Sequence, residues 1–87
     1  MPKGSGYICS WHVGDEAGLI HVCDGDNLVG DDVAFPFASC STDLQATLKK
    51  KDIEQAEDCP PPAGALRVRF DFDIQNGGDL AVNVRPI

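Results

Sequence analysis

The chain has 87 residues, of which 43% are hydrophobic and 24% are charged, and this composition is typical of one small globular domain spanning residues 1–87. Fourteen Asp and Glu against seven Lys and Arg give a formal net charge of −7, which argues against nucleic acid or an anionic membrane as the partner. No apolar run approaches the roughly 18 residues that cross a bilayer.

The negative charge lies in the N-terminal half of the chain. Residues 4–48 contain no Lys or Arg but seven acidic residues, whereas the charges of the remainder cancel. An acidic surface that lacks cations favours a partner with a basic surface. We therefore predict that the partner is bound by these acidic side chains: Asp15, Glu16, Asp24, Asp26, Asp31 and Asp32.

The first predicted element is a β-hairpin over about residues 7–23. Two short β-prone runs flank a glycine-bounded turn, as hairpins require. We predict that Val13 pairs with Leu19. Because side chains alternate along a strand, the same register places Cys9 opposite Cys23.

Four cysteines in a domain of this size predict a disulfide framework. The register above favours a Cys9–Cys23 bond, and Cys40 would then pair with Cys59 by elimination. Free thiols and a zinc site with nearby histidines are the alternatives. The start of the chain as written shows no signal peptide. We therefore expect an extracellular protein if the disulfides form, and an intracellular or virion protein otherwise.

The middle of the chain predicts an edge strand and a short helical segment. Residues 33–38 have the composition of a strand, and Pro36 restricts that strand to an edge or a bulge. Thr42 and Gln45 have the spacing of a capping box, which favours a helix. Apolar residues also alternate over 43–50, as they would in a strand. Both helix and strand therefore remain open for 43–50.

The C-terminal segment predicts a second β-hairpin, over about residues 67–85. Apolar and charged residues alternate on both sides of an Asn-Gly-Gly turn. We predict that Ile74 pairs with Leu80. The same register places Phe70 opposite Val84.

Together these elements predict a β-rich α+β fold. In it, hairpins at about 7–23 and 67–85 flank the edge strand and the short helix, and disulfides staple the single domain. The predicted core takes one apolar face from each element: Ile8, Trp11, Val13, Leu19, Val22, Phe35, Phe37, Leu44, Leu48, Phe70, Phe72, Ile74, Leu80, Val82 and Val84.

The segment 24–32 is the best candidate for a metal site, because Asp and Asn oxygens suit calcium. It departs from the helix–loop–helix calcium pattern, since Leu28 replaces a polar ligand and no Glu closes the segment. Zinc would need His12 and His21 to converge with cysteines, but the predicted hairpin turns these histidines to opposite faces. We therefore expect a solvated acidic turn here, with no metal and no cofactor.

No group of side chains predicts catalysis. His21 lies near cysteines, but an acidic neighbourhood does not lower the pKa of a thiol, so we interpret it as a structural histidine. Asp71 and Asp73 share a strand face with arginines and are interpreted as solvated charges. Trp11 and Tyr7 could form a platform for stacking on a sugar, although both residues also fit a core.

The sequence therefore predicts a small acidic, non-enzymatic binding protein, such as a secreted inhibitor, an effector or a lectin-like module. We expect a protein partner with a basic surface, with a glycan as the second ligand class, and we expect neither nucleic acid nor membrane. One alternative is a structural subunit of a larger assembly such as a virion, in which the chain would oligomerise. The other is a calcium- or zinc-dependent structural module.

Overall fold

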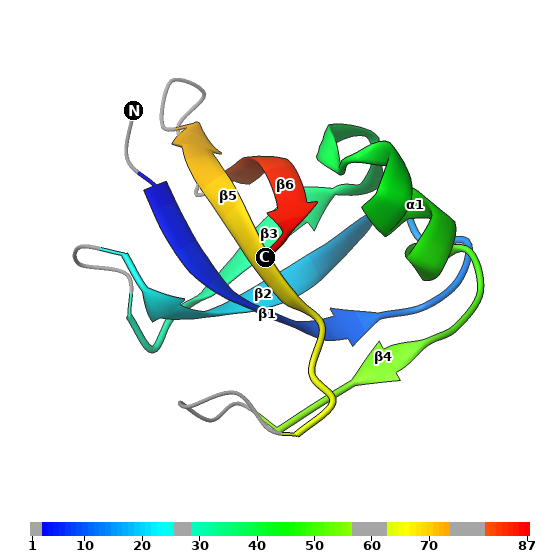
Figure 1. Ribbon diagram of the computed structural model, residues 1–87, viewed down its shortest axis with the longest axis horizontal. Helices are drawn as coiled ribbons and strands as arrows, with labels where there is room; N and C mark the ends of the chain where they lie inside the picture. Colours follow the sequence, from blue (N-terminus) through cyan, green and yellow to red (C-terminus); the bar gives the residue numbers. More distant parts are fainter. Residues whose placement is uncertain (1–2, 26–28, 57–62, 74–79) are drawn as a thin grey trace.

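The computed structural model describes residues 3–25, 29–56, 63–73 and 80–87 (Figure 1). The elements in chain order are β1 (Lys3–Trp11), β2 (Ala17–Asp24), β3 (Asp32–Pro36), the 3-10 helix η2 (Phe37–Ser39), α1 (Thr42–Leu48), β4 (Ile53–Glu54), β5 (Arg67–Asp73) and β6 (Leu80–Pro86). Within these residues, no helix is long and apolar enough to cross a membrane.

Five of the described strands close into a barrel. The strands follow the order β2-β3-β6-β5-β1-β4, and an additional β2–β1 pairing joins the ends of the five longer strands. All pairs are antiparallel except β3–β6, which is parallel and brings Ala34 beside Leu80. The two-residue β4 lies outside this ring and pairs with the end of β1. Closure leaves few exposed strand edges, which protects a small β-rich protein from association through its edges.

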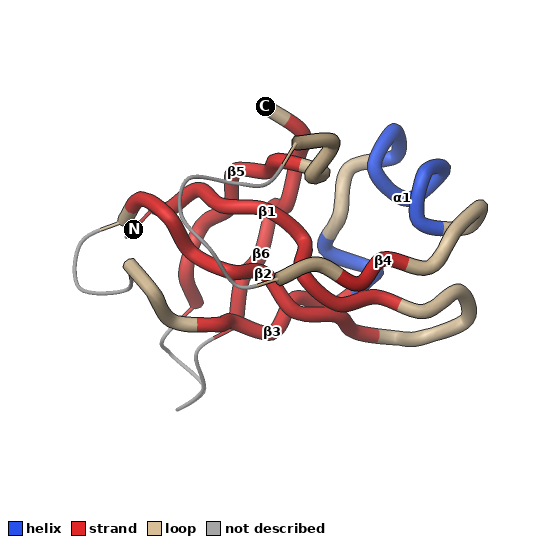
Figure 2. Tube along the Cα trace, turned by 90° about the horizontal axis from the view of Figure 1, so that it is seen from below, coloured by secondary structure: helices blue, strands red, loops and turns tan. Residues whose placement is uncertain are grey.

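Helix α1 covers one end of the barrel (Figures 1 and 2). Leu44 and Leu48 lie four residues apart on one helix face, and both are fully buried in the barrel core. The helix begins at a Ser41 cap, whose side chain accepts a hydrogen bond from the backbone N–H of Leu44 at 3.3 Å. The structure therefore decides between helix and strand for 43–50 in favour of a helix that ends at Leu48. After the helix the chain continues into the two-residue strand β4.

The predicted capping box at Thr42 and Gln45 is wrong. The cap is one residue earlier, at Ser41. The amide of Gln45 instead donates to the carbonyl oxygens of Phe37 and Cys40, both at 3.1 Å. These bonds tie the helix to the turn that precedes it.

The pairing of β1 with β2 is confirmed, but the predicted register is wrong. Ser10, not Val13, lies opposite Leu19, and Val13 is 50% exposed in the turn. The ladder shifts at a bulge between Ile8 and Ser10, where β1 holds one extra residue. This bulge occupies the position of Cys9, so Cys9 does not face Cys23.

The predicted register of β5 and β6 holds at only one end of the pair. Arg69 lies opposite Arg85, as predicted, but Asp71 lies opposite Val82, one residue away from the prediction. Asn83, which has a φ of 52°, lies where the ladder shifts. Because a slip of one residue exchanges the two faces of a strand, Ala81 is buried, Leu80 is 36% exposed and Val82 is half-buried. The Ile74 pairing lies outside the described residues.

The predicted layout of two hairpins around an edge strand is corrected by the closed barrel. Strand β3 is interior, because it pairs with β2 on one side and β6 on the other. Pro36 is tolerated because it is the last residue of β3, where the chain enters η2. The coarser prediction of a small, β-rich domain with one short helix is confirmed.

Both predicted disulfides are wrong. Neither Cys9 nor Cys40 forms a disulfide, so no disulfide joins two of the described cysteines. Burial raises the pKa of the Cys40 thiol to about 11. Cys23 is disulfide-bonded, and Cys59, the remaining cysteine, lies outside the described residues.

Candidate functional site

The acidic residues predicted to bind a partner form separate groups. Asp15 and Glu16 lie in the turn before β2, whereas Asp32, the first residue of β3, lies opposite His21 of β2, with Asp31 just before it. At about 3.3 Å per residue, the stretch of β2 from Ala17 to His21 separates these groups by roughly 15 Å. The predicted single acidic face is therefore two separate acidic groups, one at each end of the β2–β3 pairing, and we call them the acidic ends.

The two other predicted acidic residues belong to neither end. Asp24 is the last residue of β2 and lines a hollow beside β1 and β5. Asp26 lies outside the described residues.

An apolar strip lies between the two acidic ends, on the outside of the barrel. Leu19 lies opposite Ala34, and Ala34 lies beside Leu80, so one row crosses β2, β3 and β6. Leu19 is 38% exposed and Leu80 is 36% exposed. Ala17 lies opposite Pro36 one pair further along the same face. We call these five residues the apolar strip.

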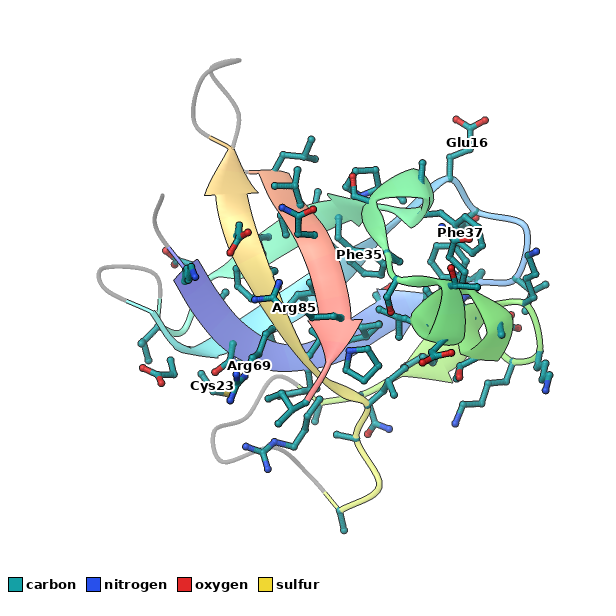
Figure 3. All side chains as sticks on the ribbon, turned by 45° about the horizontal axis from the view of Figure 1, so that its top comes forward. Glu16, Cys23, Phe35, Phe37, Arg69 and Arg85 are labelled. Carbon is teal, nitrogen blue, oxygen red and sulfur yellow. The ribbon has the colours of Figure 1, made fainter. Side chains whose placement is uncertain are left out.

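Alternation along β3 explains why this face is outward. Val33 and Phe35 are buried in the barrel, so Ala34 and Pro36 between and after them point outward. Figure 3 shows Phe35 among the strands and the Glu16 side chain projecting away from them at the same end of the molecule. The strip therefore combines small outward side chains with two exposed leucines.

One acidic end of the strip opens onto a hollow of about 410 Å³. Pro36, Phe37 and Ala38 form its apolar lining, and Asp15 and Glu16 supply its carboxylates. The backbone N–H of Phe37 donates to the carbonyl oxygen of Glu16 at 2.8 Å, which fixes the turn against the end of β3. A long cationic side chain could place its stem on the apolar lining and its charge at the carboxylates.

At the other acidic end, Asp32 pairs with a buried histidine. The Nδ1 atom of His21 lies 2.8 Å from the carboxylate of Asp32, and His21 is only 6% exposed. The His21 ring also packs against Tyr7 with ring centroids 5.7 Å apart. Burial among these partners agrees with the interpretation of His21 as a structural residue.

His12 belongs to the first acidic end. Its Nε2 atom lies 3.0 Å from Glu54 and its Nδ1 atom 3.5 Å from Asp15. The hydrogen bond with Glu54 raises the pKa of His12, the partial loss of solvent opposes this, and the charges of Asp15, Glu54 and Asp52 raise it further. Protonation of His12 therefore adds one cation to this acidic end.

We predict that the proton NMR titration of His12 has its midpoint above 6.5, and that Glu54→Gln lowers this midpoint. Because the folded pKa is raised, the contribution of His12 to stability is present below pH 6.5 and is lost as pH rises through the folded pKa. Glu16→Gln is the matched control, since Glu16 does not act on His12. An unchanged midpoint in Glu54→Gln would contradict the assignment.

The structure does not bring the predicted metal or sugar groups together. Within the described ranges, no three His, Cys, Asp or Glu side chains gather as metal ligands, and part of the segment 24–32 lies outside those ranges. Trp11 is 1% exposed and Tyr7 0% exposed, so both belong to the core, and neither ring is available as a platform for a sugar. The segment after β4 covers Tyr7, and the Tyr7 hydroxyl donates a hydrogen bond to the carbonyl oxygen of Ala56 in that segment.

No protein-family model matches the chain, and no curated protein matches it significantly. The class of the molecule therefore rests on its topology. A closed barrel in the order β1-β2-β3-β6-β5-β1, with a helix between β3 and β5, has the Greek-key arrangement of an OB-type barrel. This topology hosts many functions, so the function must be argued from the surface.

Proposed function

We propose that this protein is a non-enzymatic interaction domain that binds a protein segment through the apolar strip and its two acidic ends. The segment would present apolar side chains to Leu19 and Leu80, and Lys or Arg on either side of them. The observation that carries the proposal is the row of Leu19, Ala34 and Leu80 across three strands, with carboxylates at both ends.

Hydrophobic burial and charge play different parts in this binding. The two leucines are about one-third exposed, and covering apolar surface contributes roughly 25 cal/mol per Å² before the costs of association. The acidic ends would mainly raise the association rate and exclude acidic partners. The proposal thus keeps four of the predicted residues, Asp15, Glu16, Asp31 and Asp32, as the electrostatic rim.

The same surface argues against nucleic acid. OB-type barrels bind oligonucleotides on the face of their second and third strands, where aromatic side chains stack on bases. In this chain the apolar residues that point outward there are Ala17, Leu19, Ala34 and Pro36, none of them aromatic, and the His21 ring on the same face is only 6% exposed. Carboxylates at both ends would also repel phosphates.

The acidic ends also argue against a second copy of the chain as the occupant. Two strips placed face to face would bring carboxylate groups toward each other, and this repulsion is strongest at low salt.

A non-enzymatic role is supported by the Cys40 thiol, which is 7% exposed. Its pKa, raised to about 11, keeps it protonated at neutral pH.

Selection from a displayed random-peptide library, followed by calorimetry, tests the proposal. We expect the enriched peptides to carry apolar residues flanked by Lys or Arg. Leu19→Ser with Leu80→Ser should weaken their binding at least tenfold, because both exposed leucines are lost. Val13→Ser is the matched control, since Val13 is 50% exposed but lies in the turn.

Three outcomes would contradict the proposal. The first is a set of enriched peptides without basic residues, and the second is binding that survives the double leucine substitution. The third is sedimentation showing self-association at low salt that the same substitution abolishes, because the strip would then be covered by another copy. In that case an assembly subunit becomes the better description.

A further inference from the structure

The basic residues of this acidic protein are grouped. Of the seven in the chain, three are the consecutive lysines 49–51 after α1. The other four line one hollow on the outside of β1, β5 and β6: Lys3, Arg67, Arg69 and Arg85. We call this the basic hollow. It lies on different strand pairs from those that carry the apolar strip, and it goes beyond the proposed function.

Two arginines of the basic hollow face each other directly. Arg69 and Arg85 are cross-strand partners in the β5–β6 ladder (Figure 3). Arg67 lies two residues before Arg69 on the same face of β5. Like charges in direct opposition destabilise a sheet by a few tenths of a kcal/mol or more. In this part of the structure, the sequence therefore retains an arrangement that folding alone disfavours.

The carboxylates of the described chain do not neutralise this group. The ion pairs among the described residues all involve histidines, and none includes a lysine or arginine. Asp71, next along β5, accepts from the amide of Asn83 at 3.1 Å instead. Asp24 also lines the basic hollow, so among the side chains of the lining four cations face one carboxylate, and their formal charge sums to +3.

The basic hollow has the size and walls of a small-molecule site. Its volume is about 490 Å³, within the range of ligand pockets in proteins. Gly4 and Gly25 give the hollow one wall of bare backbone, and a Cβ at Gly25 would lie only 2.9 Å from the Cα of Gly4. Ser5, opposite Arg69 on β1, adds a hydroxyl group to the lining, and Ile87, which is 56% exposed, adds an apolar surface.

We propose that the basic hollow binds a small molecule bearing a diphosphate group. Arginine presents a planar fork of donors that matches phosphate oxygens, and three such forks with one ammonium surround a single hollow. A compact anion with several charges satisfies these cations together, whereas a single carboxylate would leave most of them without a counter-charge. The exposed Ile87 side chain would accommodate an organic group attached to the diphosphate.

Calorimetry and amide NMR with inorganic pyrophosphate, at constant ionic strength, test this proposal on the intact chain. We expect saturable binding with shifts confined to β1, β5, β6 and the end of β2 at Asp24 and Gly25. Arg69→Gln with Arg85→Gln should weaken binding at least tenfold, and this variant should fold, because it removes a repulsion. Asp24→Asn should tighten binding, since it removes the one acidic side chain of the lining. ADP, measured in parallel, distinguishes a nucleoside diphosphate from a free diphosphate as the source.

The matched control is Lys50→Gln with Lys51→Gln. It also removes two positive charges, but from the lysines that follow α1, outside the basic hollow, so it should leave binding unchanged. Equal weakening in this control would overturn the proposal, since binding would then follow net charge alone. The absence of saturable binding to pyrophosphate would also overturn it. Citrate that binds as tightly as pyrophosphate would overturn the assignment to phosphate.

Discussion

Replacing Trp11 with alanine is expected to lower the free energy of unfolding by about 3–5 kcal/mol, as truncation of a buried tryptophan does. Trp11 is 1% exposed and stacks on Phe35 and Phe37, with ring centroids 6.0 and 5.6 Å away. Its indole N–H donates to the carbonyl oxygen of Leu48 at 2.8 Å, so it also joins β1 to the end of α1. Alanine would leave both a cavity and an unpaired carbonyl.

Chemical denaturation followed by circular dichroism measures this loss. A domain of this length has a total stability of roughly 5–10 kcal/mol, so Trp11→Ala could unfold at room temperature. Trp11→Phe gives a second measurement, because it keeps an aromatic ring for stacking but removes the hydrogen bond and part of the ring volume, at a cost of about 1–3 kcal/mol. Val13→Ala, at an exposed position of the same segment, should change stability by less than about 0.5 kcal/mol. A loss below about 1 kcal/mol in Trp11→Ala would contradict this description of the core.

The strands of this protein could be predicted from local patterns, but their pairing could not. Alternation indicated segments close to β1, β2, β3, β5 and β6 because each buries one face. The bulges at Cys9 and Asn83 have no comparable signal, and each shifts a ladder by one residue. The parallel contact of Ala34 with Leu80, which closes the barrel, joins segments 46 positions apart and has no local sequence signature.

The same shifts explain what was missed at the surface. Leu19 and Leu80 were expected in the core because the predicted hairpin registers placed them on the apolar faces, but the residues that point inward are Ile20 and Ala81. Arg69 was expected to be screened by Asp71 on the same strand face. The bonding of Asp71 to Asn83 depends on the bulge, and Asn83 lies on another strand. Acidic and basic residues could therefore be counted from the sequence, while their grouping required the fold.

Glycine at position 6 allows β1 to lie against both of its barrel neighbours. Gly6 pairs with Val22 of β2 on one side and with Val68 of β5 on the other. A Cβ at this position would lie 2.0 Å from the carbonyl oxygen of His21 and 3.1 Å from the Cα of Val22. Since those atoms belong to backbone, no rotation of a side chain could relieve the contact.

Gly6→Ala is therefore expected to destabilise the protein by about 3 kcal/mol or more, from overpacking and the loss of ladder hydrogen bonds. Gly14→Ala is the matched control, because Gly14 has a φ of +96° and a Cβ added there would meet no atom within 4 Å, so only backbone strain of about 1 kcal/mol applies. Denaturant unfolding measures both variants. Hydrogen exchange should show Gly6→Ala losing protection in β2 and β5 together, because β1 joins them in the barrel. If Gly6→Ala costs no more than Gly14→Ala, then β1 does not approach β2 this closely and the barrel is not closed at this point.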